Sequence, residues 1–215
     1  MTTISEQVSE MRAARPPRDG EPPNPFEAEQ ARLAAAGLPE GVLAAGASIA
    51  NVDLLDVDGT RTTLFDALGD KPSVVVLYRG AWCPYCSIAL RTYQAELVPA
   101  LDRHGAHLVA VSPQTPDGSL STKEKNELTF TVLSDPGNQI AHQLGVVTAP
   151  SPEALEAQRS HGLDLAERNA DGTTELPMPT TVVVDRDHVV RWIDVHPDYT
   201  TRSEPAEIIA ALEML

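Results

Sequence analysis

The sequence predicts an α/β fold, with a central mixed β-sheet flanked by helices on both faces. Short apolar, β-branched segments, such as residues 73–78 and 181–185, alternate with segments of helical periodicity, such as 88–103. A run that is apolar at nearly every position suits a strand covered on both faces. A second late segment, 189–194, follows closely enough to return as an antiparallel hairpin. The sheet is therefore expected to contain both parallel and antiparallel strands.

The first 40 residues are expected to form a helical and proline-rich extension, and residues 41–215 to form the domain. Residues 5–14 and 26–36 suit short helices, and Gly37 suits the end of the second. Between these two segments, residues 15–25 contain many prolines, which disfavour a continuous helix or a central strand. We expect this stretch to form an extended arm.

The predicted domain begins with a β-hairpin whose turn is Asp58-Gly59. The elements expected up to the late hairpin are strands at 52–56, 60–64, 73–78, 107–111 and 129–133 and helical segments at 64–68, 88–103, 121–128 and 137–144. Residues 148–179 contain loop signals around a helical stretch, 152–168, and are predicted to form an insertion before the late hairpin. Residues 203–215 suit a closing amphipathic helix.

Charge and hydropathy exclude some classes of function. The chain has 16 basic and 31 acidic residues, a formal net charge of −15, which repels phosphate backbones and anionic lipid surfaces. We therefore expect no nucleic-acid partner and no membrane partner. The longest apolar runs fall far short of the roughly 20 residues that span a bilayer, and residues 1–20 show no apolar signal-peptide core. These features predict a cytoplasmic protein.

The chemistry is expected at the only two cysteines, Cys83 and Cys86, where the central strand meets a helix. A helix N-terminus favours an anion, and Arg79 offers a nearby cation, so a thiolate is stabilised there. Pro84 suits the first helical turn because no backbone donor is needed at that position. Cysteines at i and i+3 can form a disulfide reversibly, so the pair can store two electrons without a bound cofactor.

Two other interpretations of the cysteine pair are open. A CxxC is also half of a zinc site, but the sequence has no second CxxC and no HxxxH pair among its six histidines. We therefore expect no metal. A binding module that keeps the fold without catalysis is the alternative from a different class of function.

Residues 74–86, VVVLYRGAWCPYC, resemble the active-site strand and helix of the thioredoxin-fold superfamily, particularly its peroxiredoxin-like branch, the alkyl hydroperoxide reductase and thiol-specific antioxidant (AhpC/TSA) family. The hairpin 52–64, the strand ending at Ser112-Pro113, the Leu133-Ser-Asp135 turn and the segment 179–185 are similar in order and spacing. The resemblance covers about residues 41–212 and implies a thioredoxin-like fold. It also implies an antioxidant oxidoreductase that reduces hydroperoxides or disulfides and is re-reduced by an external thiol, such as a thioredoxin or a low-molecular-weight thiol. By analogy with related folds, a homodimer is a further expectation.

The resemblance leaves the nucleophile open. The peroxiredoxin pattern assigns Cys86 as the peroxidatic cysteine and aligns Cys83 with a threonine and Arg79 with a proline. Pro179 stands where that family carries a remote arginine, and the absence of both that arginine and the threonine predicts weaker peroxide activation. In the thioredoxin pattern, Cys83 attacks, Cys86 resolves, and Pro179 is a cis-proline facing the pair. A disulfide reductase without peroxidase activity is thus the alternative enzyme.

The remaining candidates surround the cysteines. Trp82 and Tyr85 suit either the wall of a substrate groove or aromatic packing beside the first helical turn. Pro179 and Thr180 are expected to line the opposite side of the groove, and the alternative for Pro179 is a proline that only begins a strand. Residues 196–202 follow the last strand, and we favour a local hydrogen-bonded turn over a role in the site.

Overall fold

The computed structural model describes residues 2–14 and 24–215. Its main sheet has seven strands in the order β2-β1-β5-β4-β3-β8-β9. These strands are β1 (Asp53–Leu55), β2 (Arg61–Thr63), β3 (Ser73–Leu77), β4 (His107–Ser112), β5 (Thr131–Ser134), β8 (Thr180–Val184) and β9 (Val190–Val195). Because β3 pairs in parallel with β4 and antiparallel with β8, the sheet is mixed, as predicted.

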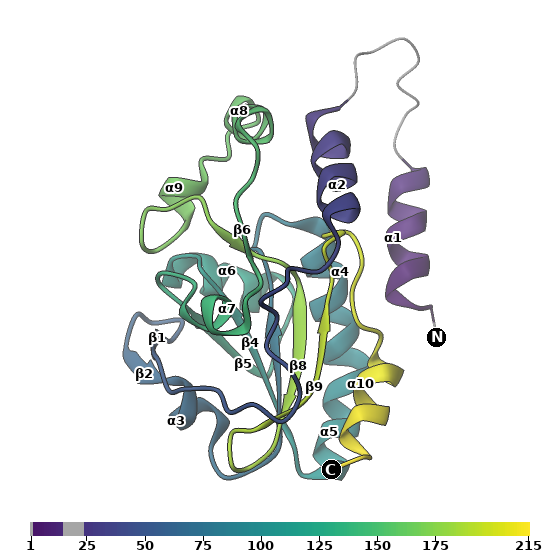
Figure 1. Ribbon diagram of the computed structural model, residues 1–215, viewed down its shortest axis with the longest axis vertical. Coiled ribbons are helices and arrows are strands. Elements are labelled where there is room, and N and C mark those ends of the chain that lie inside the picture. Colours follow the sequence, from purple (N-terminus) through teal and green to yellow (C-terminus); the bar gives the residue numbers. More distant parts are fainter. Residues whose placement is uncertain (1, 15–23) are drawn as a thin grey trace.

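Helices cover both faces of the sheet. Figure 1 shows α4, α5 and α10 on one side and α3, α6 and α7 on the other. The helical elements are α1 (Ile4–Ala13), α2 (Pro25–Ala36), α3 (Leu64–Leu68), α4 (Pro84–Thr92), the π-helical turn η1 (Tyr93–Leu97), α5 (Val98–His104), α6 (Pro116–Lys125), α7 (Gln139–Leu144), α8 (Pro152–Ser160), α9 (Leu165–Arg168) and α10 (Pro205–Leu212). None of those in the described part of the chain is long and apolar enough to cross a membrane.

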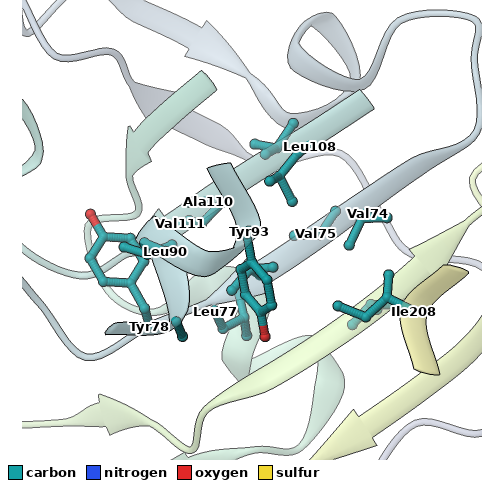
Figure 2. Close-up of a cluster of buried hydrophobic side chains, with 14 of the residues drawn as sticks. Val74, Val75, Leu77, Tyr78, Leu90, Tyr93, Leu108, Ala110, Val111 and Ile208 are labelled. Carbon is teal, nitrogen blue, oxygen red and sulfur yellow. The ribbon is translucent and has the colours of Figure 1, made fainter. Parts of the chain in front are cut away.

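The core lies where β3 and β4 meet the helices that follow the cysteines. All five residues of β3 are buried, and the cluster in Figure 2 joins Val74, Val75 and Leu77 to Leu108 and Val111 of β4. Leu90 of α4, Tyr93 of η1 and Ile208 of α10 complete the same cluster. Burial on both faces explains why these strands are apolar at consecutive positions.

The helix predicted at 88–103 begins earlier and contains a π turn. It starts at Pro84 and continues through α4, η1 and α5 to His104. The Val98 N–H donates to the Tyr93 carbonyl, the spacing of a π turn. Pro99 comes directly after Val98 and has no backbone N–H to donate. The π turn therefore lies where one α-helical hydrogen bond is already missing.

Two other predictions about secondary structure need correction. The helix expected at 121–128 is α6, which begins at Pro116 because Thr115 is extended and Pro116 suits the first turn. The insertion carries a small sheet that the sequence did not indicate, formed by β6 (Val147–Thr148) and β7 (Leu176–Pro177). Its two strands are short and distant in sequence, so only tertiary pairing reveals them.

The N-terminal extension packs on the domain. Ile4 and Val8 of α1 are buried in the core, and α1 contacts α4. The Glu204 carboxylate accepts hydrogen bonds of 2.9 Å from the backbone N–H groups of Ile4 and Ser5, so an acidic residue caps the N-terminus of α1. The proposed arm at 15–25 falls largely outside the described residues, except that Pro25 begins α2.

Replacing Gly145 by alanine is expected to destabilise the protein more than the same change at Gly105. Each glycine follows the last residue of a helix, and both have a left-handed backbone. The angles are φ 69° and ψ 30° at Gly145, and φ 63° and ψ 31° at Gly105. A Cβ at Gly145 would come within 2.6 Å of the Gly41 carbonyl carbon, whereas a Cβ at Gly105 meets no atom within 4 Å. Gly105→Ala should cost about 1–3 kcal/mol of backbone strain. Gly145→Ala should cost about 1–3 kcal/mol more from overpacking.

Urea unfolding of both variants under reducing conditions measures these losses. Equal losses of unfolding free energy would contradict the predicted close packing of Gly41 against the end of α7.

Candidate active site

The two cysteines lie where the sequence predicted, at the junction of β3 and α4. Cys83 is the N-cap residue of α4, with extended backbone, and Pro84 opens the helix. Cys86 lies in the first helical turn, and the Ser87 N–H donates to the Cys83 carbonyl at 3.2 Å. Both cysteines are free thiols, and each is about 1% exposed. A compact first turn thus holds two buried sulfurs close together.

Arg202 reaches the sulfur of Cys86 from the segment after β9. Its Nη2 donates to Cys86 Sγ at 3.0 Å, and its Nη1 donates to the backbone carbonyls of Tyr199, at 2.7 Å, and Thr201. Arg202 is only 7% exposed. In the described part of the chain no carboxylate forms an ion pair with Arg202, so no carboxylate competes with the sulfur for its positive charge.

The two sulfurs have opposite electrostatic environments. Burial by itself raises the pKa of Cys86, but a hydrogen bond from Cys83, the charge of Arg202, and the backbone N–H and charge of Arg79 together hold that pKa well below its ordinary value. Burial raises the pKa of Cys83 well above its ordinary value, and its interaction with Cys86 raises it further. This environment favours the ionised form at Cys86 and the protonated form at Cys83.

The arginine that the sequence analysis judged to be lost is supplied from elsewhere in the chain. Pro179 does stand just before β8, but Arg202 provides the cation from a different segment. One of the two grounds for expecting weaker peroxide activation, the missing arginine, is thus offset, whereas Cys83 still occupies the position of the threonine. Residues 196–202 do form the predicted turn, in which the Thr201 N–H donates to the Asp198 carbonyl at 3.0 Å, but they also belong to the site. No local pattern separates Arg202 from a surface arginine, because its burial depends on how β9 packs.

Arg79 lies between two aromatic rings. Its guanidinium carbon is 4.8 Å from the centroid of the Trp82 ring and 4.0 Å from that of Tyr199. The Tyr85 ring is 6.2 Å from the Tyr199 ring, and Tyr85 is buried. Aromatic faces attract a cation without neutralising it. Trp82 and Tyr85 thus help to form the wall of the site.

Pro179 immediately precedes β8 and Thr180 begins it, but the pair does not form the expected cis-proline pattern. Every peptide bond in the described residues is trans, so the expectation of a cis-proline at Pro179 is wrong. Pro179 lines a narrow cavity together with Arg79 and Tyr199. The Thr180 hydroxyl donates to the Met178 carbonyl at 2.9 Å, and the backbone of Thr180 pairs with Leu77 of β3.

Gln114, which the sequence analysis missed, supports the turn before the cysteines. Its Oε1 accepts from the Ala81 N–H at 2.8 Å, and its Nε2 donates to the Tyr78 hydroxyl at 2.8 Å. A Cβ at Gly80, whose φ is 146°, would lie 2.5 Å from the Trp82 indole nitrogen and 3.2 Å from Gln114 Oε1. Glycine is required here because the turn packs so closely against both side chains.

A groove of about 620 Å³ opens beside the cysteines. Trp82, Pro84 and Ile88 form part of one wall, and Gln7 and Met11 of α1 form part of the other. Among residues 2–14 and 24–215, no group of three or more His, Cys, Asp or Glu side chains is placed to hold a metal ion. The candidate active site thus consists of the dithiol, two arginines and an aromatic wall.

A CxxC pair at the start of the helix that follows the central strand of a mixed, helix-covered sheet defines a thioredoxin-fold dithiol protein. More specifically, the chain belongs to the AhpC/TSA family, whose model matches residues 45–193.

Curated relatives of the chain are named peroxiredoxins. It is 35% identical over 96 residues to the putative peroxiredoxin bcp of Haemophilus influenzae, a match that covers 43% of this chain and 59% of that protein. It is 33% identical over 107 residues to peroxiredoxin Bcp of Escherichia coli, which covers 48% and 65% of the two chains. A chloroplastic peroxiredoxin Q of rice is 26% identical over 153 residues, covering 71% of this chain and 59% of the relative. The chain therefore spans about three fifths of the length of these relatives.

Solved structures support the fold. The peroxidoxin BcpB of Mycobacterium tuberculosis superposes with a TM-score of 0.60 at 22% identity, covering 80% of this chain and 97% of that one. Reduced Prx3 of Vibrio vulnificus, solved in complex with H2O2, superposes with a TM-score of 0.64 at 19% identity and covers 80% and 99%. The thioredoxin-like architecture predicted from the sequence is confirmed.

Arg202→Met is expected to reduce the thiolate population of Cys86. A thiol whose pKa is held low stays ionised until the pH falls through that value, so loss of the cation moves the transition to higher pH. At a pH below the new midpoint, the thiolate fraction should fall roughly tenfold or more. The absorbance of the thiolate near 240 nm, followed against pH, measures the change.

The matched control is Arg103→Met, because Arg103 is exposed at the end of α5. Its titration should coincide with that of the unmodified protein. A titration of Arg202→Met that also coincides would show that the contact between Arg202 and Cys86 does not hold the thiolate.

Proposed function

We propose that this protein is a thiol-dependent peroxidase in which Cys86 attacks the hydroperoxide. The observation that carries the proposal is the buried contact between Arg202 and Cys86, at 3.0 Å, with Cys83 as a second donor to the same sulfur. The thiolate is the reactive form of cysteine, and this arrangement favours it at Cys86. Membership of the AhpC/TSA family supports the same chemistry.

The proposed cycle uses two electrons from the dithiol. The Cys86 thiolate attacks the terminal peroxide oxygen, the O–O bond breaks, and an alkoxide or hydroxide leaves and takes up a proton, while Cys86 becomes a sulfenic acid. The Cys83 thiol then attacks the Cys86 sulfur, water leaves, and an intramolecular disulfide forms. The i and i+3 positions of the pair on the first turn suit this closure.

Two arginines supply charge for the first step. Negative charge moves from the sulfur to the departing oxygen as the O–O bond breaks, and a preorganised cation stabilises it best in a site that excludes water. Arg202 donates directly to the sulfur, and Arg79 is held nearby between Trp82 and Tyr199. Within the proposal, Arg202 and Arg79 stabilise the thiolate and the leaving oxygen.

The contrast between the two thiols favours the peroxidase over a disulfide reductase. A thioredoxin-like reductase needs a reactive thiolate at the first cysteine, Cys83, but burial and Cys86 raise the pKa of Cys83. A buried cation beside a sulfur is costly unless a negative charge compensates it, so the contact favours a thiolate at Cys86 over a binding module with idle thiols.

The disulfide formed in the proposed cycle has to be reduced by an external thiol, and this requirement indicates the partners. The better leaving group is the thiol of lower pKa, so an external thiolate should attack the Cys83 sulfur and release Cys86. The reductant would be a thioredoxin or a low-molecular-weight thiol, and the groove beside Trp82 and Pro84 offers a place of approach. A cycle that needs reduction at each turnover suits the cytoplasm. By analogy with related folds, we also propose a homodimer.

Cys86→Ser is expected to abolish peroxide consumption, because it removes the nucleophile. Cys83→Ser should still consume one equivalent of peroxide and leave a Cys86 sulfenic acid, because only the resolving thiol is lost. Peroxide consumption, dimedone labelling and peptide mass spectrometry measure these outcomes. Sulfenic acid found on Cys83 in the Cys86→Ser protein, with peroxide consumed, would contradict the assignment.

Cys83→Ala and Cys83→Ser form a matched pair that tests the hydrogen bond from Cys83. Both remove the resolving thiol, but serine keeps a donor next to Cys86. The single-turnover rate of sulfenic acid formation at neutral pH should therefore be several-fold lower for alanine than for serine. Equal rates would mean that residue 83 supplies no donor to the Cys86 thiolate.

A further inference from the structure

Arg202 has to be held against the sulfur by its surroundings, because an arginine side chain is flexible. Its backbone lies in a loop between β9 and α10. The hydrogen bonds that shape this loop converge on Ser203, which is fully buried, and on His196. The guanidinium itself donates to the Tyr199 and Thr201 carbonyls of this loop, so the position of the loop bears on where the guanidinium lies.

Asp194, near the end of β9, anchors the loop at both of its ends. One carboxylate oxygen, Oδ2, accepts from the Ser203 hydroxyl at 2.7 Å and lies 2.9 Å from His196 Nε2. The other ring nitrogen of His196, Nδ1, lies 2.7 Å from the Thr201 hydroxyl, inside the loop. Backbone pairing of Asp194 with Thr181 of β8 fixes the carboxylate relative to the sheet.

Tyr93 anchors the same point from the opposite direction. Its hydroxyl donates to the Ser203 carbonyl at 2.7 Å, and Tyr93 is fully buried in the core. Tyr93 is the first residue of η1, the π turn, on the helix that carries Cys86. The hydrogen bond thus ties the residue after Arg202 to the helix of the nucleophile, and Figure 2 places Tyr93 among the core side chains.

We propose that Asp194 and Tyr93 are positioning residues that hold Arg202 in hydrogen-bonding contact with the Cys86 sulfur by anchoring Ser203 and His196. Neither residue touches a sulfur in the described hydrogen bonds. Ser203 is held through its side chain by β9 and through its carbonyl by η1, so Arg202, the preceding residue, has little freedom to retreat. The inference rests on the proposed role of Cys86 as the thiolate.

The direction in which the Cys86 titration moves distinguishes a positioning role of Asp194 from a purely electrostatic effect of its charge. Asp194 is an anion near the site, so loss of its charge alone would stabilise the Cys86 thiolate and move its titration to lower pH. Loss of the anchor would let Arg202 move away and would move the titration to higher pH. Tyr93→Phe changes no charge at neutral pH and removes only the hydroxyl that donates to Ser203.

The experiment compares Asp194→Ala, Asp194→Asn and Tyr93→Phe with the parent protein, all carrying Cys83→Ser so that Cys86 is the only thiol. Thiolate absorbance near 240 nm against pH is the readout. We expect Asp194→Ala and Tyr93→Phe to lower the thiolate fraction by roughly tenfold at a pH below the midpoint. Asp194→Asn keeps an acceptor oxygen, so its thiolate fraction should stay close to that of the parent protein.

Asp185→Ala is the matched control. Asp185 also anchors a loop, accepting from the N–H groups of Asp187 and Val189 and from Arg191, but it follows β8 at the other end of the hairpin. Its loss should lower the melting temperature and leave the thiolate titration unchanged.

Each outcome decides between the explanations. A titration moved to lower pH in Asp194→Ala, or left unchanged in Tyr93→Phe, would overturn the proposal. A parent protein whose Cys86 titrates at the ordinary value of a free thiol would instead refute the proposed function, before any variant is compared.

Discussion

The candidate active site depends on the contact between a buried arginine and a buried sulfur. Arg202 carries a full charge at a position only 7% exposed, and burying an isolated guanidinium is costly. Two backbone carbonyls satisfy part of its hydrogen-bonding capacity, and the rest is directed at Cys86. A thiolate at Cys86 and the guanidinium would thus stabilise each other, because a single buried charge in a site that excludes water is costly.

The spacing of the CxxC gives two identical side chains different roles. Cys83 precedes the helix as its N-cap residue, and Cys86 lies one turn later, where Arg202 reaches it. The interaction between the two thiols lowers the pKa of Cys86 and raises the pKa of Cys83. In the proposed cycle, a single geometry therefore provides both a nucleophile and a resolving thiol that carries its own proton.

Segments outside the family match also reach the site. The Tyr199 hydroxyl donates to the Phe26 carbonyl at 3.1 Å and lies 3.1 Å from Gln30 Nε2, both on α2, while its ring lies against Arg79. The N-terminal extension thus helps to hold the aromatic wall around the second cation. The protein has a formal net charge of −15, so these two buried arginines make the site locally cationic within an acidic molecule.

The sequence by itself determined the class of fold and the location of the chemistry, because both depend on local patterns. Consecutive apolar residues at 73–78 indicate a doubly covered strand, and Cys83 and Cys86 follow it at a spacing that only a few kinds of site use. Only the tertiary structure decided which thiol has a cation beside it, since Arg202 is 116 positions from Cys86 in the chain. It also decided the trans geometry of Pro179, the β6–β7 pairing and the anchors at Asp194 and Tyr93. These features arise from contacts between distant segments, and no periodicity or spacing in the chain encodes such contacts.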